Sequence, residues 1–408
     1  MSGLPQTADV VILGGGVMGA STAYHLASRG HTNILLLERE SFFGTGATGR
    51  CAGGIRHQFN TEVNIRLSQK SLTMIDALEE ETGQSALVQK CGYLFVLSDE
   101  KDVSVFQNSL KLQHSLGVKT EWLSGDEVRR LTAPCVFQDA IAGTFNADDG
   151  LADPNSIVMG YINAARRHGA VCLTDCSATG IELKKNKVRK VRTSLGTVET
   201  ETVVNACGPW SAFFGNEIGL EIPVSPLRRQ WFVTENIPEL PAEFPFVIDF
   251  SQSLYFHREA SGLLSGMSNH NQKIGADQSI DQAWEMRHIE AALKRMPLLG
   301  NSGIKSRQAG LYELTPDAHP IIGSTLVEGF YLLTGFSGHS FVQGPICGKL
   351  MAEILIDGKA STVDISMLDY KRFAEKRLIP EYNVVYSFPD CVLLLFTVSC
   401  IKQILSHF

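Results

Sequence analysis

Three glycines near the start of the chain have the spacing of a turn that binds phosphates. They follow the apolar run Val10 to Leu13 and precede the small and apolar residues Ala20 to Ala27. A strand, a glycine turn and a helix in this order place the free N–H groups of the helix N-terminus against a pyrophosphate. The first glycine permits the tight turn, the second lets the backbone approach the phosphates, and the third lets the helix lie close on the strand. The motif consists of Gly14, Gly15, Gly16, Val17, Met18 and Gly19.

A carboxylate follows at the distance where a dinucleotide-binding unit places its ribose contact. A second apolar run, Asn33 to Leu37, ends at Glu38, about 20 residues beyond Gly19. An acid there accepts hydrogen bonds from a ribose 2′-hydroxyl and disfavours a 2′-phosphate. These residues predict a dinucleotide site without deciding between NAD and FAD. The alternative is a glycine turn that binds no nucleotide.

The segment from Arg39 to Phe59 is rich in Gly, Ser and Thr. This composition is typical of a loop that exposes N–H and hydroxyl donors, which suit a second phosphate or a flavin edge. The alternative is a surface loop made flexible by its glycines.

The glycine motif and this loop resemble the amino-acid-oxidase-like family of FAD oxidoreductases, which includes sarcosine oxidases, glycine oxidase and dye-linked proline dehydrogenases. The resemblance covers roughly residues 8 to 383 and recurs in Val203 to Ser211, Gly310 to Asp317, Pro320 to Gly323 and Gly335 to Phe341. It implies FAD as a cofactor. The residues that it assigns to FAD are Gly14, Gly16, Val17, Met18, Gly19, Glu38, Arg39, Thr48, Gly49, Gly53, Gly54, Ala206, Gly208, Trp210, Gly310, Gly338, His339, Ser340 and Phe341.

The order of these motifs predicts an α/β fold with a discontinuous, Rossmann-like FAD-binding domain. We expect residues 8–90, 151–222 and 301–383 to form it. Residues 91–150 and 223–300 are expected to form an α+β substrate domain with a mainly antiparallel sheet. Its strands are predicted from apolar and aromatic runs, which are Gly92 to Leu97, Arg229 to Thr234 and Ser253 to His257.

Two further runs predict secondary structure near the later motifs. Val198 to Ala206 is expected to form one strand that ends in the turn at Gly208. Phe330 to Thr334 is expected to be a buried strand, followed by a glycine loop and a helix over Ile346 to Ile356. A helix N-terminus at this place suits the negative charge of a reduced flavin. An ordinary βα turn is the alternative.

The resemblance implies a substrate that carries both an amine and a carboxylate. A guanidinium is the natural partner of the carboxylate, and Arg56 matches the position where sarcosine-oxidase-like members place such an arginine. Tyr255 and Tyr312 match aromatic positions that line the pocket, and His57 and His339 lie in motif loops. Each also has a structural alternative, as a packed aromatic or a satisfied histidine. A neutral amine needs no general base.

Three departures from the family pattern qualify the expected reaction. Gly310 stands where monomeric sarcosine oxidases have the cysteine that bonds the flavin, so non-covalent FAD is expected. Val342 stands where those oxidases have a lysine that contacts the carboxylate. Leu264 aligns with their oxygen-activating lysine, and without that cation the reaction with dioxygen should be slow. We therefore expect a dehydrogenase that passes electrons to an acceptor protein or partner subunit.

The composition of the chain limits the classes of protein to which it can belong. With 408 residues, 44% of them hydrophobic, the chain can bury a sizeable core. Its net charge of -7 disfavours nucleic acid as a partner. Nine cysteines without metal-site spacing indicate reduced thiols and no metal in a cytoplasmic protein. Residues 1–9 lack a basic or Arg-rich leader, which disfavours secretion and mitochondrial import.

Residues 384–408 form an atypical apolar tail. Its apolar run, Cys391 to Ile401, is shorter than the roughly 17–25 residues that span a bilayer, so a membrane anchor is disfavoured. A partner-facing helix, a buried strand and an ending foreign to the family are the alternatives.

Three functions are compatible with the sequence. The first is FAD-dependent oxidation of a small secondary or N-methylated amino acid, such as proline, sarcosine, dimethylglycine or glycine. The second is a flavin-binding assembly or interaction subunit without turnover. The third, an NAD-dependent dehydrogenase, predicts a colourless protein.

Overall fold

The apolar run at the start of the chain forms β1 at the centre of a six-stranded sheet, in the order β18-β19-β12-β1-β2-β8. The structure is a computed structural model that describes residues 3–382, so the prediction for the tail lies outside the described residues. All neighbours in this sheet are parallel except β18 and β19. The strands are β1 (Val10–Leu13), β2 (Ile34–Leu37), β8 (Val171–Leu173), β12 (Val203–Asn205), β18 (Ile321–Ser324) and β19 (Phe330–Thr334).

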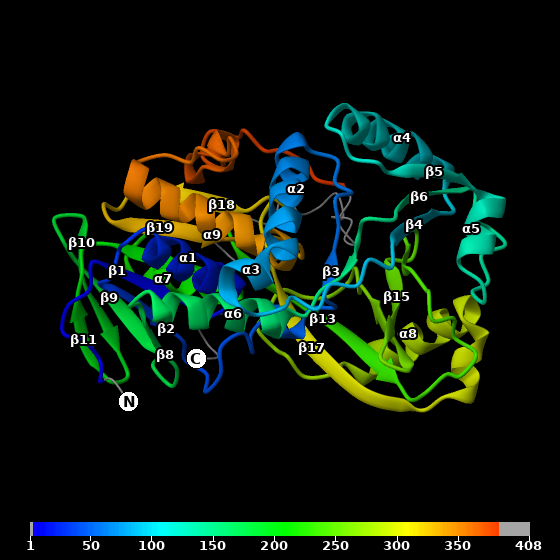
Figure 1. The fold of residues 1–408 in the computed structure, drawn as a ribbon, viewed down its shortest axis with the longest axis horizontal. Coiled ribbons are helices and arrows are strands. Elements are labelled where there is room, and N and C mark those ends of the chain that lie inside the picture. The colour runs from blue at the N-terminus through cyan, green and yellow to red at the C-terminus, as the bar shows by residue number, and fades with distance from the viewer. Residues whose placement is uncertain (1–2, 383–408) are drawn as a thin grey trace.

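Both faces of this sheet are covered, which explains why its strands are continuously apolar. Val10 and Ile12 of β1 belong to the core beneath the helices, whereas Val11 and Leu13 pack toward the three-stranded sheet β11-β10-β9. Figure 1 shows these layers on the two sides of the sheet. The covering elements are α1 (Val17–Ser28), α2 (Glu62–Asp76), α3 (Leu78–Thr82), α6 (Pro154–Arg167), α7 (Ser211–Glu217), α9 (Ser340–Asp357), β9 (Ala178–Lys184), β10 (Lys187–Thr193) and β11 (Gly196–Glu199).

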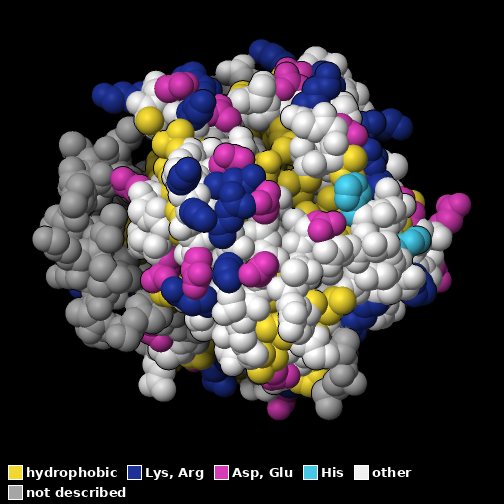
Figure 2. Space-filling model, turned by 90° about the vertical axis from the view of Figure 1, so that its left-hand side faces the viewer, with side chains coloured by type: hydrophobic (Ala, Val, Ile, Leu, Met, Phe, Trp, Pro, Cys, Tyr) yellow, Lys and Arg dark blue, Asp and Glu magenta, His cyan; other side chains and the backbone are white. Residues whose placement is uncertain are grey.

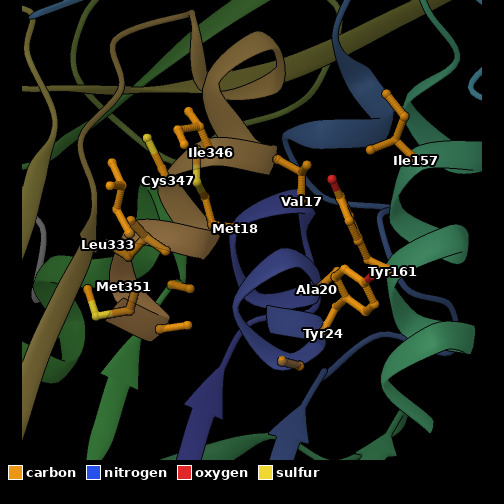
Figure 3. Packing of buried hydrophobic residues seen from close by; sticks show 14 of the residues in the cluster. Val17, Met18, Ala20, Tyr24, Ile157, Tyr161, Leu333, Ile346, Cys347 and Met351 are labelled. Atoms are coloured by element: carbon orange, nitrogen blue, oxygen red, sulfur yellow. The ribbon is translucent and has the colours of Figure 1, made fainter. Parts of the chain in front are cut away.

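Helix α1 lies between α6 and α9, at the centre of the largest core. Figure 3 shows Met18 directed toward Ile346 and Cys347 of α9, and Tyr24 beside Tyr161 of α6. The Tyr24 and Tyr161 ring centroids are 5.3 Å apart. Helices α1 and α9, which are far apart in the sequence, therefore share one core. This core holds α1 and the turn before it in place.

A second sheet has eight strands, in the order β17-β13-β16-β15-β14-β4-β6-β5, and only its pair β4 and β14 is parallel among the described strands. The predicted α/β fold with a mainly antiparallel second sheet is confirmed. Its elements are β4 (Tyr93–Leu97), β5 (Glu121–Ser124), β6 (Ala142–Asn146), β13 (Ser225–Thr234), β14 (Phe246–Asp249), β15 (Leu254–Glu259), β16 (Gly262–Met267), β17 (Ile304–Leu314), α4 (Glu100–Ser115), α5 (Gly125–Leu131) and α8 (Gln282–Arg295).

Two segments differ from the predicted layout. The run Val198 to Ala206 is divided between two sheets, because its first residues end β11 and its last residues form β12. Residues 301–383 were assigned to the FAD-binding domain, yet β17 pairs along its length with β13 of the eight-stranded sheet. The end of β17 thus reaches the FAD-binding layer from the other sheet.

The surface over the three-stranded sheet mixes charges of both signs, as Figure 2 shows. The basic side chains of β10 are paired with carboxylates, in the ion pairs Lys187–Glu201, Lys190–Glu199 and Arg192–Glu217. This face therefore has no uniform positive field.

Candidate active site

The glycine turn between β1 and α1 leaves no room for side chains. Gly14 has φ +103°, and a Cβ there would overlap the carbonyl group of Ala206 at the end of β12. A Cβ on Gly19 would overlap the carbonyl oxygen of Gly14. Both glycines are therefore required by close backbone approaches, as the spacing indicates.

A cavity of about 360 Å³ lies at the N-terminus of α1. Its wall is formed by the turn after β1, the end of β2, the loop before residue 48, the segment after β12 and the start of α9. Gly19, the third residue of α1, does not line the cavity. The predicted cofactor residues that line the cavity are Gly14, Gly16, Val17, Met18, Glu38, Arg39, Thr48, Ala206, Gly208, Trp210 and Ser340.

Polar groups in this cavity have the chemistry of a nucleotide site. Glu38 accepts hydrogen bonds from the backbone N–H groups of Gly15 (2.8 Å) and Glu40 (2.9 Å), which hold its carboxylate at the cavity wall. The guanidinium of Arg39 lies 4.1 Å from the ring centroid of Trp210. The helix N-terminus attracts phosphate, and the carboxylate suits a ribose hydroxyl.

A second cavity, of about 110 Å³, lies between the two large sheets, and we call it the substrate cavity. The predicted residues that line it are Gly53, Gly54, Arg56, Tyr255, Tyr312, Gly338, His339 and Phe341. Other lining residues that sequence reasoning did not assign to the site include Cys51, Tyr93, Arg229, Trp231 and Phe246.

Arg56 brings a guanidinium into the wall of the substrate cavity. The residue is 7% exposed, its guanidinium lies 3.9 Å from the ring centroid of Phe59, and Nη1 donates to the carbonyl oxygen of Gln58. Burial lowers the pKa of Arg56 from its ordinary value, but an arginine still stays charged at neutral pH. Arg229 contributes a second guanidinium, 5.1 Å from the ring centroid of Tyr312.

Aromatic side chains form the other walls. The rings of Tyr93 and Phe246 are stacked with centroids 4.3 Å apart, and Tyr255 lies 5.7 Å from Phe246. Burial raises the pKa of Tyr93, Tyr255 and Tyr312, so these phenols are neutral donors at physiological pH. The cavity thus combines fixed positive charge with an apolar enclosure.

Residues at the start of α9 fit a flavin. His339 is 4% exposed, and neither of its ring nitrogens has a hydrogen-bond partner among residues 3–382. Burial and the charge of Arg56 lower the pKa of His339 well below its ordinary value, so the imidazole is neutral. A Cβ on Gly338 would overlap the ring of Tyr312, so the backbone before α9 packs directly against that ring. A buried imidazole without a hydrogen-bond partner among residues 3–382, in the wall of the substrate cavity, suits the polar edge of isoalloxazine.

His57, Gly49 and Gly310 do not line either cavity. His57 Nδ1 lies 2.6 Å from Oδ1 of the fully buried Asp149, which also accepts from the His57 backbone N–H. His57 was expected either to donate to flavin or substrate or to be a satisfied structural histidine, and its contact with Asp149 favours the structural alternative. Gly310 faces Arg50, since its Cβ would lie 2.9 Å from that side chain.

A third cavity, of about 510 Å³, shares the wall residues Cys51, Ala52, Gly53 and Trp231 with the substrate cavity. Leu264 of β16 lines this cavity and is 4% exposed. Gly49 also lines it. The cations at its wall are Arg258 and the exposed Lys305.

Three features of the described residues bear on the predictions about thiols, metal sites and the membrane. The seven cysteines that the structure describes are free thiols. Within residues 3–382 no cluster of acidic, His or Cys side chains has the arrangement of a metal site. Among the described helices, none combines the length and apolar character needed to cross a membrane.

Comparison with known proteins places this geometry among flavoenzymes. A family model described as FAD dependent oxidoreductase, DAO, matches residues 9–354. The structure of L-proline dehydrogenase from P. horikoshii is 30% identical, with a TM-score of 0.85, and the match covers 92% of this chain and 100% of that one.

Two curated relatives are much longer than this chain. Sarcosine dehydrogenase, mitochondrial, of Homo sapiens is 31% identical, over 91% of this chain and 42% of the relative. The pyruvate dehydrogenase phosphatase regulatory subunit, mitochondrial, of Mus musculus is 28% identical, over 91% of this chain and 44% of the relative. The chain thus spans less than half the length of these proteins.

Proposed function

This chain belongs to the DAO family of FAD-dependent oxidoreductases, and we propose on that premise that it oxidises the C–N bond of a small secondary or N-methylated amino acid. Bound FAD supplies the acceptor for the hydride equivalent, and water hydrolyses the imine product. The observation that carries the proposal is the buried guanidinium of Arg56 in a small, aromatic cavity beside His339.

The residues of the substrate cavity contribute to substrate binding in different ways. Arg56 pairs with the substrate carboxylate, and its charge fixes the orientation of the amino acid. The two guanidiniums of Arg56 and Arg229 repel an ammonium group and so favour the neutral amine, whose lone pair assists loss of the hydride. The aromatic walls exclude water and limit the size of the substrate. Gly310 has no side chain that could bond FAD, which supports non-covalent binding.

An anaerobic titration of the yellow holoprotein tests this function. Proline, sarcosine, dimethylglycine or glycine should bleach the visible absorbance of the flavin, and the matching amine without a carboxylate should do so far less. A holoprotein that stays yellow with every member of the panel would contradict catalysis. That result would favour the second candidate, a flavin-binding subunit without turnover, for which the similarity to a regulatory subunit is the specific observation.

We propose further that the electrons leave to an acceptor other than dioxygen. Leu264 aligns with the oxygen-activating lysine of the sarcosine oxidases and places an apolar side chain in the wall of the third cavity. Arg258 and Lys305 also line that cavity, but neither occupies the aligned position, where a cation would stabilise superoxide as it forms. Leu264→Lys is therefore expected to raise the rate of reoxidation by dioxygen about tenfold or more. Stopped-flow mixing of the reduced enzyme with oxygenated buffer measures it, and Leu264→Met is the matched control. Rapid reoxidation of the unaltered enzyme would contradict the proposal.

A further inference from the structure

Glu313 is a buried carboxyl group in the wall of the 360 Å³ nucleotide cavity. It follows Tyr312 on β17, is 5% exposed, and lines the cavity together with Gly14, Gly208 and Ser340. None of the ion pairs in the described part of the chain includes it. A carboxylate at this place has no ion-pair partner among residues 3–382 to offset its charge.

Glu313 receives hydrogen bonds from the backbone N–H groups of Gly335 and Phe336 and from Thr334, and these favour its ionised form less than burial disfavours it. Its Oε2 lies 2.9 Å from Oγ1 of Thr334 and accepts from the backbone N–H of Gly335 at 3.0 Å. Oγ1 of Thr334 also lies 3.1 Å from the carbonyl oxygen of Gly208 and accepts from Oγ of Ser211 at 2.8 Å. The threonine hydroxyl has one hydrogen but two acceptors, so it can satisfy only one of them.

The neutral acid resolves this shortage. If Glu313 carries a proton, its O–H donates to Oγ1 of Thr334, whose own hydrogen then donates to the carbonyl oxygen of Gly208. If Glu313 is ionised, it takes the threonine hydrogen, and the carbonyl of Gly208 keeps only the backbone N–H of Ser211 as a donor among the described residues. Burial also favours the neutral acid, because it raises the pKa of Glu313 to about 7.

The charged groups near Glu313 do not reverse this preference. The other titratable side chains that line the cavity are Glu38, Arg39, Glu40, Cys176 and Cys207, which lie beside β2, β9 and β12. Helix α1 contributes Val17 and Met18 to the wall, and β13 places Pro226 opposite Glu313. At the start of α9, His339 is neutral. The charge that FAD brings into the cavity near Glu313 is the negative charge of its pyrophosphate.

We propose that Glu313 is a positioning residue that holds FAD most tightly as the neutral acid, so that binding of FAD near and above neutral pH takes up one proton at this carboxyl group. Two anions in one water-poor cavity repel, and the neutral acid removes that repulsion. The same proton frees the Thr334 hydroxyl to donate to the carbonyl oxygen of Gly208, which lines the cavity.

Uptake of a proton makes the affinity for FAD depend on pH. Below pH of about 7 the free protein already carries the proton, and affinity for FAD is greatest. As the pH rises through this value, binding must take up a proton, and the affinity falls by up to tenfold per pH unit. It becomes constant again once the pH exceeds the pKa of Glu313 in the complex.

Titration of deflavinated protein with FAD between about pH 6 and pH 8.5 tests the proposal. The dissociation constant is read from quenching of flavin fluorescence, and proton uptake from an indicator dye in weak buffer. The unaltered protein should show a dissociation constant that rises with pH and an uptake approaching one proton above neutrality. Glu313→Gln should bind FAD with little dependence on pH, because the amide stays neutral.

Glu40→Gln is the matched control, because this carboxylate lines the same cavity but is exposed. It should keep the pH dependence of the unaltered protein. A flat profile in the unaltered protein, or an unchanged slope in Glu313→Gln, overturns the proposal. If Glu313→Gln does not fold, the dye measurement on the unaltered protein decides, since an uptake near zero over the whole range excludes the linkage.

Discussion

Replacement of Arg56 by methionine should lower kcat/KM for the amino acid substrate by about a hundredfold to a thousandfold. The change leaves a carboxylate to enter a buried cavity without its charged partner, which costs about 3–5 kcal/mol. Arg56→Lys should lose less but not recover fully, because an ammonium group cannot make two parallel hydrogen bonds to a carboxylate. FAD should stay bound in both variants, since Arg56 does not line the nucleotide cavity.

Two substrates separate this role from a structural one. The amine without a carboxylate should lose little of its already low activity in Arg56→Met, whereas the amino acid should lose most of it. Arg307→Lys provides a control, because Arg307 is on the surface and pairs with Glu285. Equal losses for both substrates would show that Arg56 supports the fold and does not bind the carboxylate.

Gly19→Ala is expected to abolish tight FAD binding. The new Cβ would overlap the carbonyl oxygen of Gly14, so that α1 must move away from β1 and carry its N-terminus out of the phosphate site. Overpacking of this kind costs about 1–3 kcal/mol of stability, and affinity for FAD should fall by at least about a hundredfold. The flavin absorbance per protein and thermal unfolding with and without FAD measure the two effects.

Gly46→Ala is the control for that prediction. Gly46 lines the same cavity, and the nearest atom to a Cβ there, in the ring of Trp210, is 3.9 Å away. This variant should bind FAD like the unaltered protein. A yellow, stable Gly19→Ala protein would contradict the argument from the glycine spacing.

The features that sequence reasoning found are those encoded by consecutive residues. The glycine turn and Glu38 belong to one β1-α1-β2 unit, whose geometry is nearly independent of the rest of the chain. The strands β4, β13 and β15 were recognisable because aromatic and branched residues are concentrated in them.

The sequence-based errors concern residues whose role depends on the direction of the side chain or on a partner far away in the sequence. Arg56 lines the substrate cavity, whereas the neighbouring His57 is held by Asp149 outside it. The role of Asp149 as the partner of His57 depends on a contact across 92 residues, which no local pattern carries.

The site residues that the sequence did not indicate come from strand pairing. Arg229 lies opposite Gly310 in the register of β13 and β17, and Glu313 reaches the nucleotide cavity only because β17 extends from one sheet to the other. Similarly, Val198 to Ala206 is one apolar run, but tertiary packing divides it between two sheets. The expected cytoplasmic location and the acceptor of the electrons stay predictions.

The nucleotide cavity draws its wall from the turn after β1, from Gly208, from Glu313 and from Ser340. During synthesis a chain that has left the ribosome only as far as β12 has the phosphate turn but neither the opposite wall nor the α9 partner of α1. Flavin can therefore be enclosed only after almost the whole polypeptide has emerged, and a product of premature termination before α9 would accumulate colourless.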